Sequence, residues 1–256
     1  MSHPLQPNRS EVPRRDDDPT STGDEPLNRL AAAIRRISAV AVGHPVPDRE
    51  IARAAEQLVE IAESLEGSAT ISRRARSQPN LAGHPQDFFP SSPIIGFANP
   101  IAPPVEVWLG ESDDGQAEIR GRVTFGYPYE GPPTCVHGGV IAELFDELMG
   151  AANVIADKPA MTGTLTVRYR RPTPLLAPLD LVARFVRSEG RKVHTWAAIY
   201  HEGGLTAEAN GLFIQVQPGH VLEIVTTDAT ATDATATDEP PIDASVARSI
   251  AENGAD

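Results

Sequence analysis

The sequence predicts an α+β domain over residues 95–218, in which an antiparallel sheet curls around a single apolar helix. The first observation is a strongly hydrophobic run from Val140 to about Ile155, because a helix this apolar needs cover on most of its surface. The second is a series of segments that alternate apolar and polar residues, as Ala117–Phe125 does, which is typical of half-buried strands. Turn signals such as Glu189-Gly190 separate these segments. Two strands, one helix and four more strands would bury the helix against the sheet.

The chain before this domain is expected to hold a disordered segment, two helices and an arm. Residues 1–25 combine Pro, Arg and Asp with almost no apolar content, so they cannot bury enough surface to offset the cost of ordering the chain. Leu27–Ala41 and Arg49–Leu65 repeat apolar residues every three to four positions. This spacing predicts two accessory helices within residues 26–66, as a hairpin or a loosely docked pair. The proline-containing residues 67–94 are expected to form an extended arm over the core.

Six strands are expected in the domain itself. They are Val105–Leu109, Ala117–Phe125, Gly163–Arg171, Leu179–Ser188, Val193–His201 and Ala207–Gln217. After the domain, residues 219–256 include a Thr/Ala/Asp repeat over residues 226–238, which contains no residue larger than Thr or Asp. This composition predicts a disordered acidic tail.

Charge and composition exclude several classes of function. The chain has 256 residues and a net charge of −13, which disfavours general nucleic-acid binding. Cys135 is the only cysteine, so an internal disulfide and a cysteine-rich zinc site are excluded. No apolar run approaches the roughly 18–20 residues that span a membrane, and the N-terminus lacks the apolar core of a secretory signal. We therefore expect a cytoplasmic protein without a membrane span, a metal site or a cofactor.

The most informative motif is His137-Gly138-Gly139, followed nine residues after the histidine by Asp146. The two glycines allow a ligand close to the backbone where the apolar helix begins. The unpaired N–H groups of a helix start favour developing negative charge. Asp146 lies in a run too hydrophobic to be an exposed face. An oxyanion site and an acid on one short helix indicate acyl chemistry.

This arrangement resembles the hotdog-fold acyl-CoA thioesterases. The likeness is to the branch of phenylacetate-pathway thioesterases, and within it to thioesterase superfamily members 4 and 5. It extends to Met161–Pro174, to the hairpin Glu189-Gly190-Arg191-Lys192 and to Ala207–Ile214. The resemblance covers roughly residues 100–218. It implies an antiparallel sheet wrapped around a central helix, hydrolysis of acyl-CoA, with fatty acyl-CoA of lipid metabolism as the expected substrate, and a homodimer or dimer of dimers.

The resemblance also implies roles for individual residues. Asp146 would be the catalytic carboxylate, either activating water or attacking directly, and Thr162 would help to position the water. His137, Gly138 and Gly139 would lie at the substrate carbonyl, with a backbone N–H near Gly139 as oxyanion donor. Arg191, Lys192 and Arg170 are candidate contacts for the CoA phosphates, because Arg grips phosphate in bidentate fashion. The CoA moiety belongs to the substrate.

Each of these residues also has a structural interpretation. Asp146 could pair with an arginine, Thr162 could be an ordinary strand residue, and Arg191 and Lys192 could belong to a solvated hairpin. His137 is expected to shape the oxyanion loop rather than to act as a base. The neighbouring acids Glu143 and Glu147 compete with Asp146 and are expected to face solvent or to bind an arginine.

Two other functions remain open from the sequence. Hotdog folds also serve as dehydratases of hydroxyacyl thioesters, usually with a histidine and a carboxylate, and the pair His137 and Asp146 is compatible with that chemistry. The domain could instead be a non-catalytic acyl-CoA binding module. Assays of thiol release and of water loss separate the three possibilities.

Overall fold

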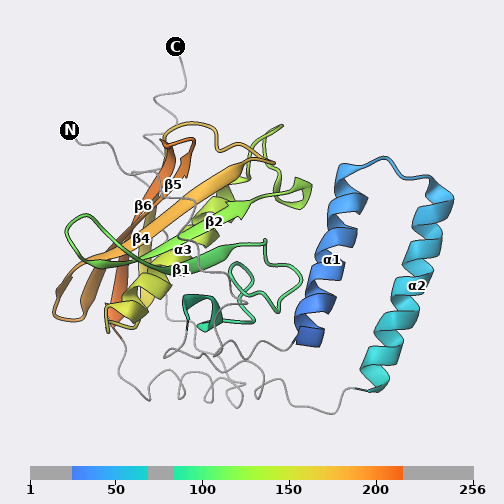
Figure 1. Cartoon of the computed structure of the whole chain (residues 1–256), viewed down its shortest axis with the longest axis horizontal. Coiled ribbons are helices and arrows are strands. Elements are labelled where there is room, and N and C mark those ends of the chain that lie inside the picture. Colours follow the sequence, from blue (N-terminus) through green and yellow to red (C-terminus); the bar gives the residue numbers. More distant parts are fainter. Residues whose placement is uncertain (1–24, 69–83, 216–256) are drawn as a thin grey trace, which may run out of the picture. The chain divides into compact units, whose positions relative to one another are not determined.

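The computed structural model describes residues 25–68 and 84–215 (Figure 1). Two segments, residues 1–25 and 219–256, were expected to be disordered. Residues 1–24 and 219–256 lie outside the described part of the chain, and residue 25 is the first residue of a helix. None of the helices within the described ranges is long and apolar enough to cross a membrane.

A six-stranded antiparallel sheet forms the main layer of the protein. Its strands are β1 (Glu106–Glu111), β2 (Ala117–Thr124), β3 (Ala160–Tyr169), β4 (Pro178–Glu189), β5 (Lys192–His201) and β6 (Gly204–Gln215). Their order across the sheet is β1-β2-β4-β5-β6-β3. The predicted α+β class is therefore confirmed, and every predicted strand is present with its ends shifted by a few residues.

The helix α3 (Gly138–Ile155) packs against one face of this sheet (Figure 1). Its residues Leu144, Phe145, Leu148 and Met149 are completely buried. The strands meet them with the alternate residues that point to the same face, such as Ile119, Val123, Leu179, Ala197, Ile199 and Phe213. This period-two burial agrees with the alternation seen in the sequence.

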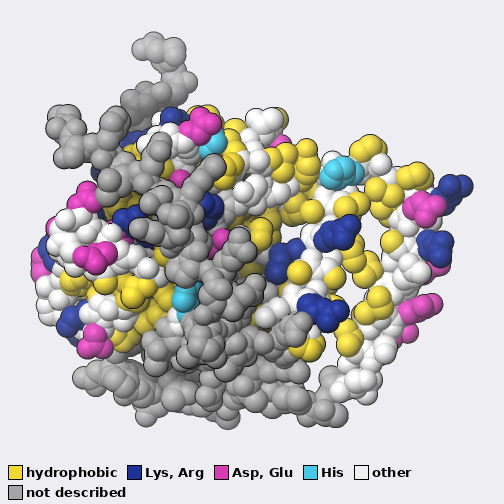
Figure 2. Space-filling view, viewed as in Figure 1, with side chains coloured by type: hydrophobic (Ala, Val, Ile, Leu, Met, Phe, Trp, Pro, Cys, Tyr) yellow, Lys and Arg dark blue, Asp and Glu magenta, His cyan; other side chains and the backbone are white. Residues whose placement is uncertain are grey.

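The two accessory helices are present as α1 (Glu25–Gly43) and α2 (Asp48–Gly67). Helix α1 is anchored to the rest of the described chain: an Arg35 guanidinium N–H donates to the Asn99 carbonyl at 2.9 Å, and the His44 ring contacts the Tyr127 ring edge-on. No residue of α2 is buried in the described structure. Both helices carry apolar side chains on the surface (Figure 2), namely Leu30, Ile37, Val40, Val42, Ile51, Leu58, Val59, Ile61 and Leu65. The two helices therefore fit the predicted loosely docked pair better than a closely packed helical hairpin.

The described end of the predicted arm, residues 84–94, and the residues up to β1 belong to the core. Phe88, Ile94 and Ile95 are buried in the same cluster as α3. The Gln86 side chain joins the arm to the sheet, since its amide donates to the Ile95 carbonyl and accepts from the Val107 N–H, both at 2.8 Å. Of the predicted arm, residues 84–94 contact the core, and residues 69–83 lie outside the described residues.

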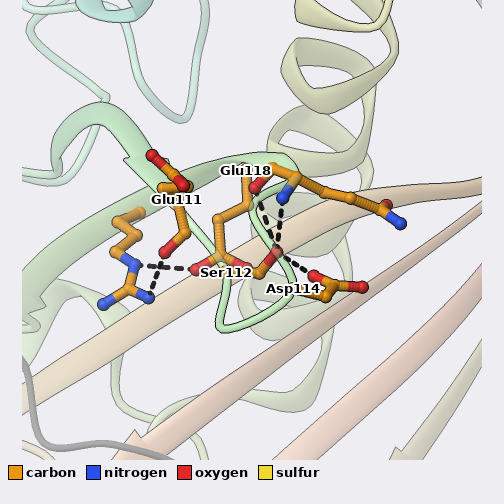
Figure 3. Close-up of polar contacts among 6 residues, drawn as sticks. Glu111, Ser112, Asp114 and Glu118 are labelled. Carbon is orange, nitrogen blue, oxygen red and sulfur yellow. Dashed lines mark hydrogen bonds and ion pairs between the residues drawn. The ribbon is translucent and has the colours of Figure 1, made fainter.

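The face of the sheet that points away from α3 carries paired charges. Arg120 donates to Glu118 at 2.7 Å, and Arg122 pairs with Asp180 at the same distance. At the β1–β2 turn, Ser112 is hydrogen-bonded to Asp114 and lies beside Glu118 and Glu111 (Figure 3). These ion pairs join Arg120 to Glu118 and Arg122 to Asp180, and they belong to a different surface from that of α3.

Candidate active site

The histidine of the motif ends the preceding loop and caps α3. His137 is the N-cap residue, and its ring Nδ1 accepts a hydrogen bond from the Gly139 N–H at 3.0 Å. The backbone N–H groups of Gly138 and Val140 have no acceptor within the described residues. Because the N-terminus of a helix carries partial positive charge, these two groups form a donor pair for an anionic oxygen.

The loop before α3 is held by close backbone contacts. The His137 N–H donates to the Tyr129 carbonyl and the Val136 N–H to the Thr173 carbonyl, each at 2.9 Å. A side chain at Gly131 would lie 2.7 Å from the His137 Cα, so only glycine permits this approach. The position of the helix start is thus determined by residues on both sides of the motif.

Asp146 and Thr162 are in direct contact. The Thr162 hydroxyl donates to Asp146 Oδ1 at 2.5 Å, and the Asp146 side chain is half-buried. The register of β3 against β6 shifts between Thr162 and Thr164, so Gly163 is the extra residue of a β-bulge. Bulges re-aim neighbouring side chains, and this one lies beside the threonine that reaches α3.

A second contact joins β3 to the beginning of the same helix. The Tyr169 hydroxyl donates to the Gly138 carbonyl at 2.7 Å. Thr162 and Tyr169 therefore bind α3 at two points, one at the carboxylate and one at the helix start. Tyr169 was not among the predicted site residues, although it lies in the strand that resembles the thioesterases. Only the pairing of β3 with β6, next to α3, brings the phenol to the glycine.

The two acids beside Asp146 differ in their surroundings. Glu143 is exposed, as expected. Glu147 was expected to face solvent or an arginine, and this prediction is wrong. Burial raises the pKa of Glu147; a hydrogen bond with Ser92 opposes the rise, and the charge of Asp146 adds to it. The reason for the difference is the arm, which brings Ser92 over this side of the helix.

The three predicted phosphate contacts lie in two places. Lys192 pairs with Ile214, which pairs with Met161. The hairpin that carries Arg191 and Lys192 therefore lies two strands, or about 10 Å, from the end of β3 that holds Thr162. Arg170 is at the other end of β3, and its Nε donates to Glu208 at 2.9 Å. This bond holds the pKa of Glu208 below its usual range. The structure thus does not bring Arg170 together with Arg191 and Lys192.

The free backbone donors and the carboxylate are well separated along α3. Asp146 follows Gly138 by eight residues, which corresponds to about 12 Å along the helix axis. An oxygen atom bound at the Gly138 N–H therefore lies far from the Asp146 carboxylate of the same chain. Together the helix start, Asp146 and Thr162 can polarise a carbonyl and orient a water molecule, at two separate points.

Comparisons with known proteins are consistent with this chemistry. Residues 134–208 match a family model described as the thioesterase superfamily, and this region contains His137, Asp146 and Thr162. The acyl-coenzyme A thioesterase THEM4 of Xenopus laevis is 40% identical over 94 residues, which cover 36% of this chain and 42% of that protein. The Mus musculus protein of the same name is 36% identical over 95 residues, covering 36% and 41%. The matched region spans less than half the length of these relatives.

A solved structure is similar over a longer region. The crystal structure of a thioesterase superfamily protein has a TM-score of 0.63 and 35% identity, and the match covers 74% of this chain and 90% of that chain. Glu106–Gln215 alone is too short to account for this coverage, so the likeness includes residues before the sheet. The predicted hotdog fold agrees with this likeness.

Proposed function

The chain belongs to the thioesterase superfamily, and on that premise we propose that it hydrolyses acyl-CoA thioesters to a free acid and CoA. The observation that carries the proposal is the hydrogen bond from Thr162 to Asp146 at 2.5 Å, on a helix that begins with unpaired N–H groups. A carboxylate held by a hydroxyl can orient and deprotonate water. The helix start can stabilise the oxyanion that water attack creates.

The thioester carbonyl binds at the Gly138 N–H. The sequence predicts a donor near Gly139. The N–H of Gly139 itself is directed to the His137 ring, which supports the neighbouring Gly138 N–H as the donor to the substrate. The Tyr169 hydroxyl bonded to the Gly138 carbonyl keeps this peptide group oriented. Preorganised donors of this kind need not reorganise as charge develops on the carbonyl oxygen.

Asp146 accepts a proton from the attacking water. The water oxygen forms a bond to the carbonyl carbon, and the carbonyl oxygen becomes the oxyanion. When the carbonyl re-forms, the carbon–sulfur bond breaks, and the proton held by Asp146 returns to the CoA thiolate. The products are a carboxylic acid and the CoA thiol.

The complete site is formed by two protomers. About 12 Å of helix separates Gly138 from Asp146, so the two groups act on one thioester most readily if they come from different chains. The strand β3 pairs only with β6 among the described strands, and most of its residues are exposed. A ten-residue exposed edge is a site for pairing with another strand. A homodimer built through β3 would bring the Thr162 of each chain to the interface.

CoA is bound at the edge of this site. Arg191 and Lys192 lie on the side of the sheet where β3 holds Thr162, and their charges suit the phosphates of CoA. The preference for fatty acyl groups and the cytoplasmic location remain predictions from the sequence.

The substitution Asp146→Asn tests the proposed reaction. It retains the shape of the side chain and removes the base, so kcat/KM for acyl-CoA should fall by about 10²–10⁴-fold. Glu143→Gln is the matched control, because Glu143 is an exposed acid one turn earlier on the same helix, and it should leave the rate unchanged. Thiol release is followed with acyl-CoAs of graded length and with aromatic esters.

Near-normal turnover by Asp146→Asn would contradict this mechanism. Loss of water from a 3-hydroxyacyl-CoA without release of CoA would identify a dehydratase. Tight binding without turnover, with an affinity that Asp146→Asn does not change, would identify a binding module.

A further inference from the structure

A glycine in the middle of α3 is unusual for the stability of that helix. Gly150 follows Asp146 by four residues and lies more than a turn before the end of the helix at Ile155. Glycine is a poorer helix former than alanine, because it loses more backbone freedom on folding. A glycine is tolerated at such a position when a side chain there would obstruct something.

Nothing within the described chain obstructs a side chain at this position. A Cβ built on Gly150 has no heavy atom of another described element within 4 Å. By contrast, the Cβ of a residue at Gly211, on the sheet that faces α3, would lie 3.1 Å from the Met149 sulfur. Packing therefore explains Gly211, whereas Gly150 borders open space.

This open space lies beside the candidate catalytic carboxylate. Residues four apart in a helix lie on the same face, one turn apart, so Gly150 is directly next to Asp146. Three residues further on, Asn153 is completely buried. Its Oδ1 accepts from the Thr195 hydroxyl at 2.5 Å, while its Nδ2 has no partner among the described residues.

The unpaired amide indicates a bound water molecule beside this strip, because an acyl chain offers no hydrogen-bond acceptor. Buried polar groups are nearly always hydrogen-bonded, and an exception calls for a ligand or water. Helical side chains lean toward the N-terminus, so the Asn153 side chain leans over the turn that contains Gly150. Asp146, Gly150 and Asn153 thus lie along one strip of α3.

We infer that the acyl chain of the substrate lies across Gly150, and that the absence of a side chain there sets the length of acyl group the enzyme accepts. The inference rests on the proposed thioesterase function. The thioester is cleaved beside Asp146, and the first carbons of the acyl group pass over the bare backbone of Gly150 toward Asn153. A short acyl group ends before Gly150, whereas a long one must cross it.

The substitution Gly150→Leu tests the inference. It should lower kcat/KM for palmitoyl-CoA by about 100-fold, as misplacement of a bound substrate does, and leave that for acetyl-CoA within about threefold. Gly150→Ala should have a smaller effect in the same direction. The matched control is Gly67→Leu, because a side chain at Gly67 in α2 also meets nothing within 4 Å; it should leave the whole chain-length profile unchanged. The molecular mass of each variant in solution is measured alongside.

Four results would overturn the inference. An unchanged profile in Gly150→Leu would mean that the acyl chain lies elsewhere, while the wild-type activity would still support the proposed function. Equal loss for all chain lengths would indicate a general defect rather than selection by length. If Gly150→Leu lowers the molecular mass from that of a dimer to that of a monomer, the open space beside Gly150 is filled by the partner protomer and not by the acyl chain. If the wild-type protein releases no CoA from any substrate, both the proposed function and the inference fail.

Discussion

Thr162→Val removes the hydroxyl that holds the proposed catalytic carboxylate and retains the size and β-propensity of the side chain. The hydrogen bond that is lost spans 2.5 Å and ends on Asp146. Hydrogen bonds to charged groups contribute about 1.5–3 kcal/mol. Thr162 is exposed, so the lower end of this range applies. A loss of about 1.5 kcal/mol of transition-state stabilisation corresponds to roughly a tenfold fall in kcat/KM.

The assay is thiol release under initial-rate conditions, with circular dichroism to establish that each variant is folded. Thr164→Val is the matched control, because Thr164 is an exposed threonine on the same strand and should keep the wild-type rate. A double-mutant cycle with Asp146→Asn isolates the coupling between the two side chains. In the Asp146→Asn background, Thr162→Val should have little further effect.

Two outcomes would refute this reasoning. If Thr162→Val keeps a rate within about twofold of the wild type, the hydroxyl has no part in positioning the carboxylate or the water. If it lowers the rate equally with and without the Asp146 carboxylate, the threonine acts independently of Asp146.

Two further predictions concern the helix start and the arm. Tyr169→Phe removes the bond to the Gly138 carbonyl at 2.7 Å, a neutral hydrogen bond of about 0.5–1.5 kcal/mol, so kcat should fall by about two- to tenfold in steady-state assays; a change in KM alone would argue against orientation of this peptide group. Burial raises the pKa of Glu147, so its contribution to stability is present below the unfolded pKa and is lost as pH rises through the folded pKa. Glu147→Gln should therefore raise the melting temperature at pH 8 and leave it unchanged at pH 4, and equal shifts at both pH values would exclude this cause.

Much of the fold could be predicted from local patterns. The alternation in Ala117–Phe125 reflects the pleat of a strand with one buried face, and this segment forms the strand β2 in the structure. The apolar run after Gly139 predicts a covered helix, and α3 is covered by the sheet. These features depend on residues close together in sequence, where period and composition carry the information.

The prediction for Glu147 was wrong because the surroundings of this side chain depend on residues that are distant in sequence. Helical spacing places Glu147 away from Asp146 but does not reveal what covers that side. Ser92 comes from the arm, more than fifty residues earlier, and only tertiary packing brings it there. The same limit applies to Tyr169, whose hydroxyl reaches Gly138 only because β3 lies at the edge of the sheet beside α3.

The sequence by itself determined the α+β class, the order of the strands along the chain, and the pairing of a glycine-rich helix start with an acid nine residues after its histidine. The tertiary structure decided which groups can act together. It directed the Gly139 N–H to His137, joined Thr162 to Asp146, and held Arg170 on Glu208. The physical reason is that secondary structure follows from local periodicity, whereas a hydrogen bond requires atoms within about 3 Å, and tertiary packing is what brings residues distant in sequence that close.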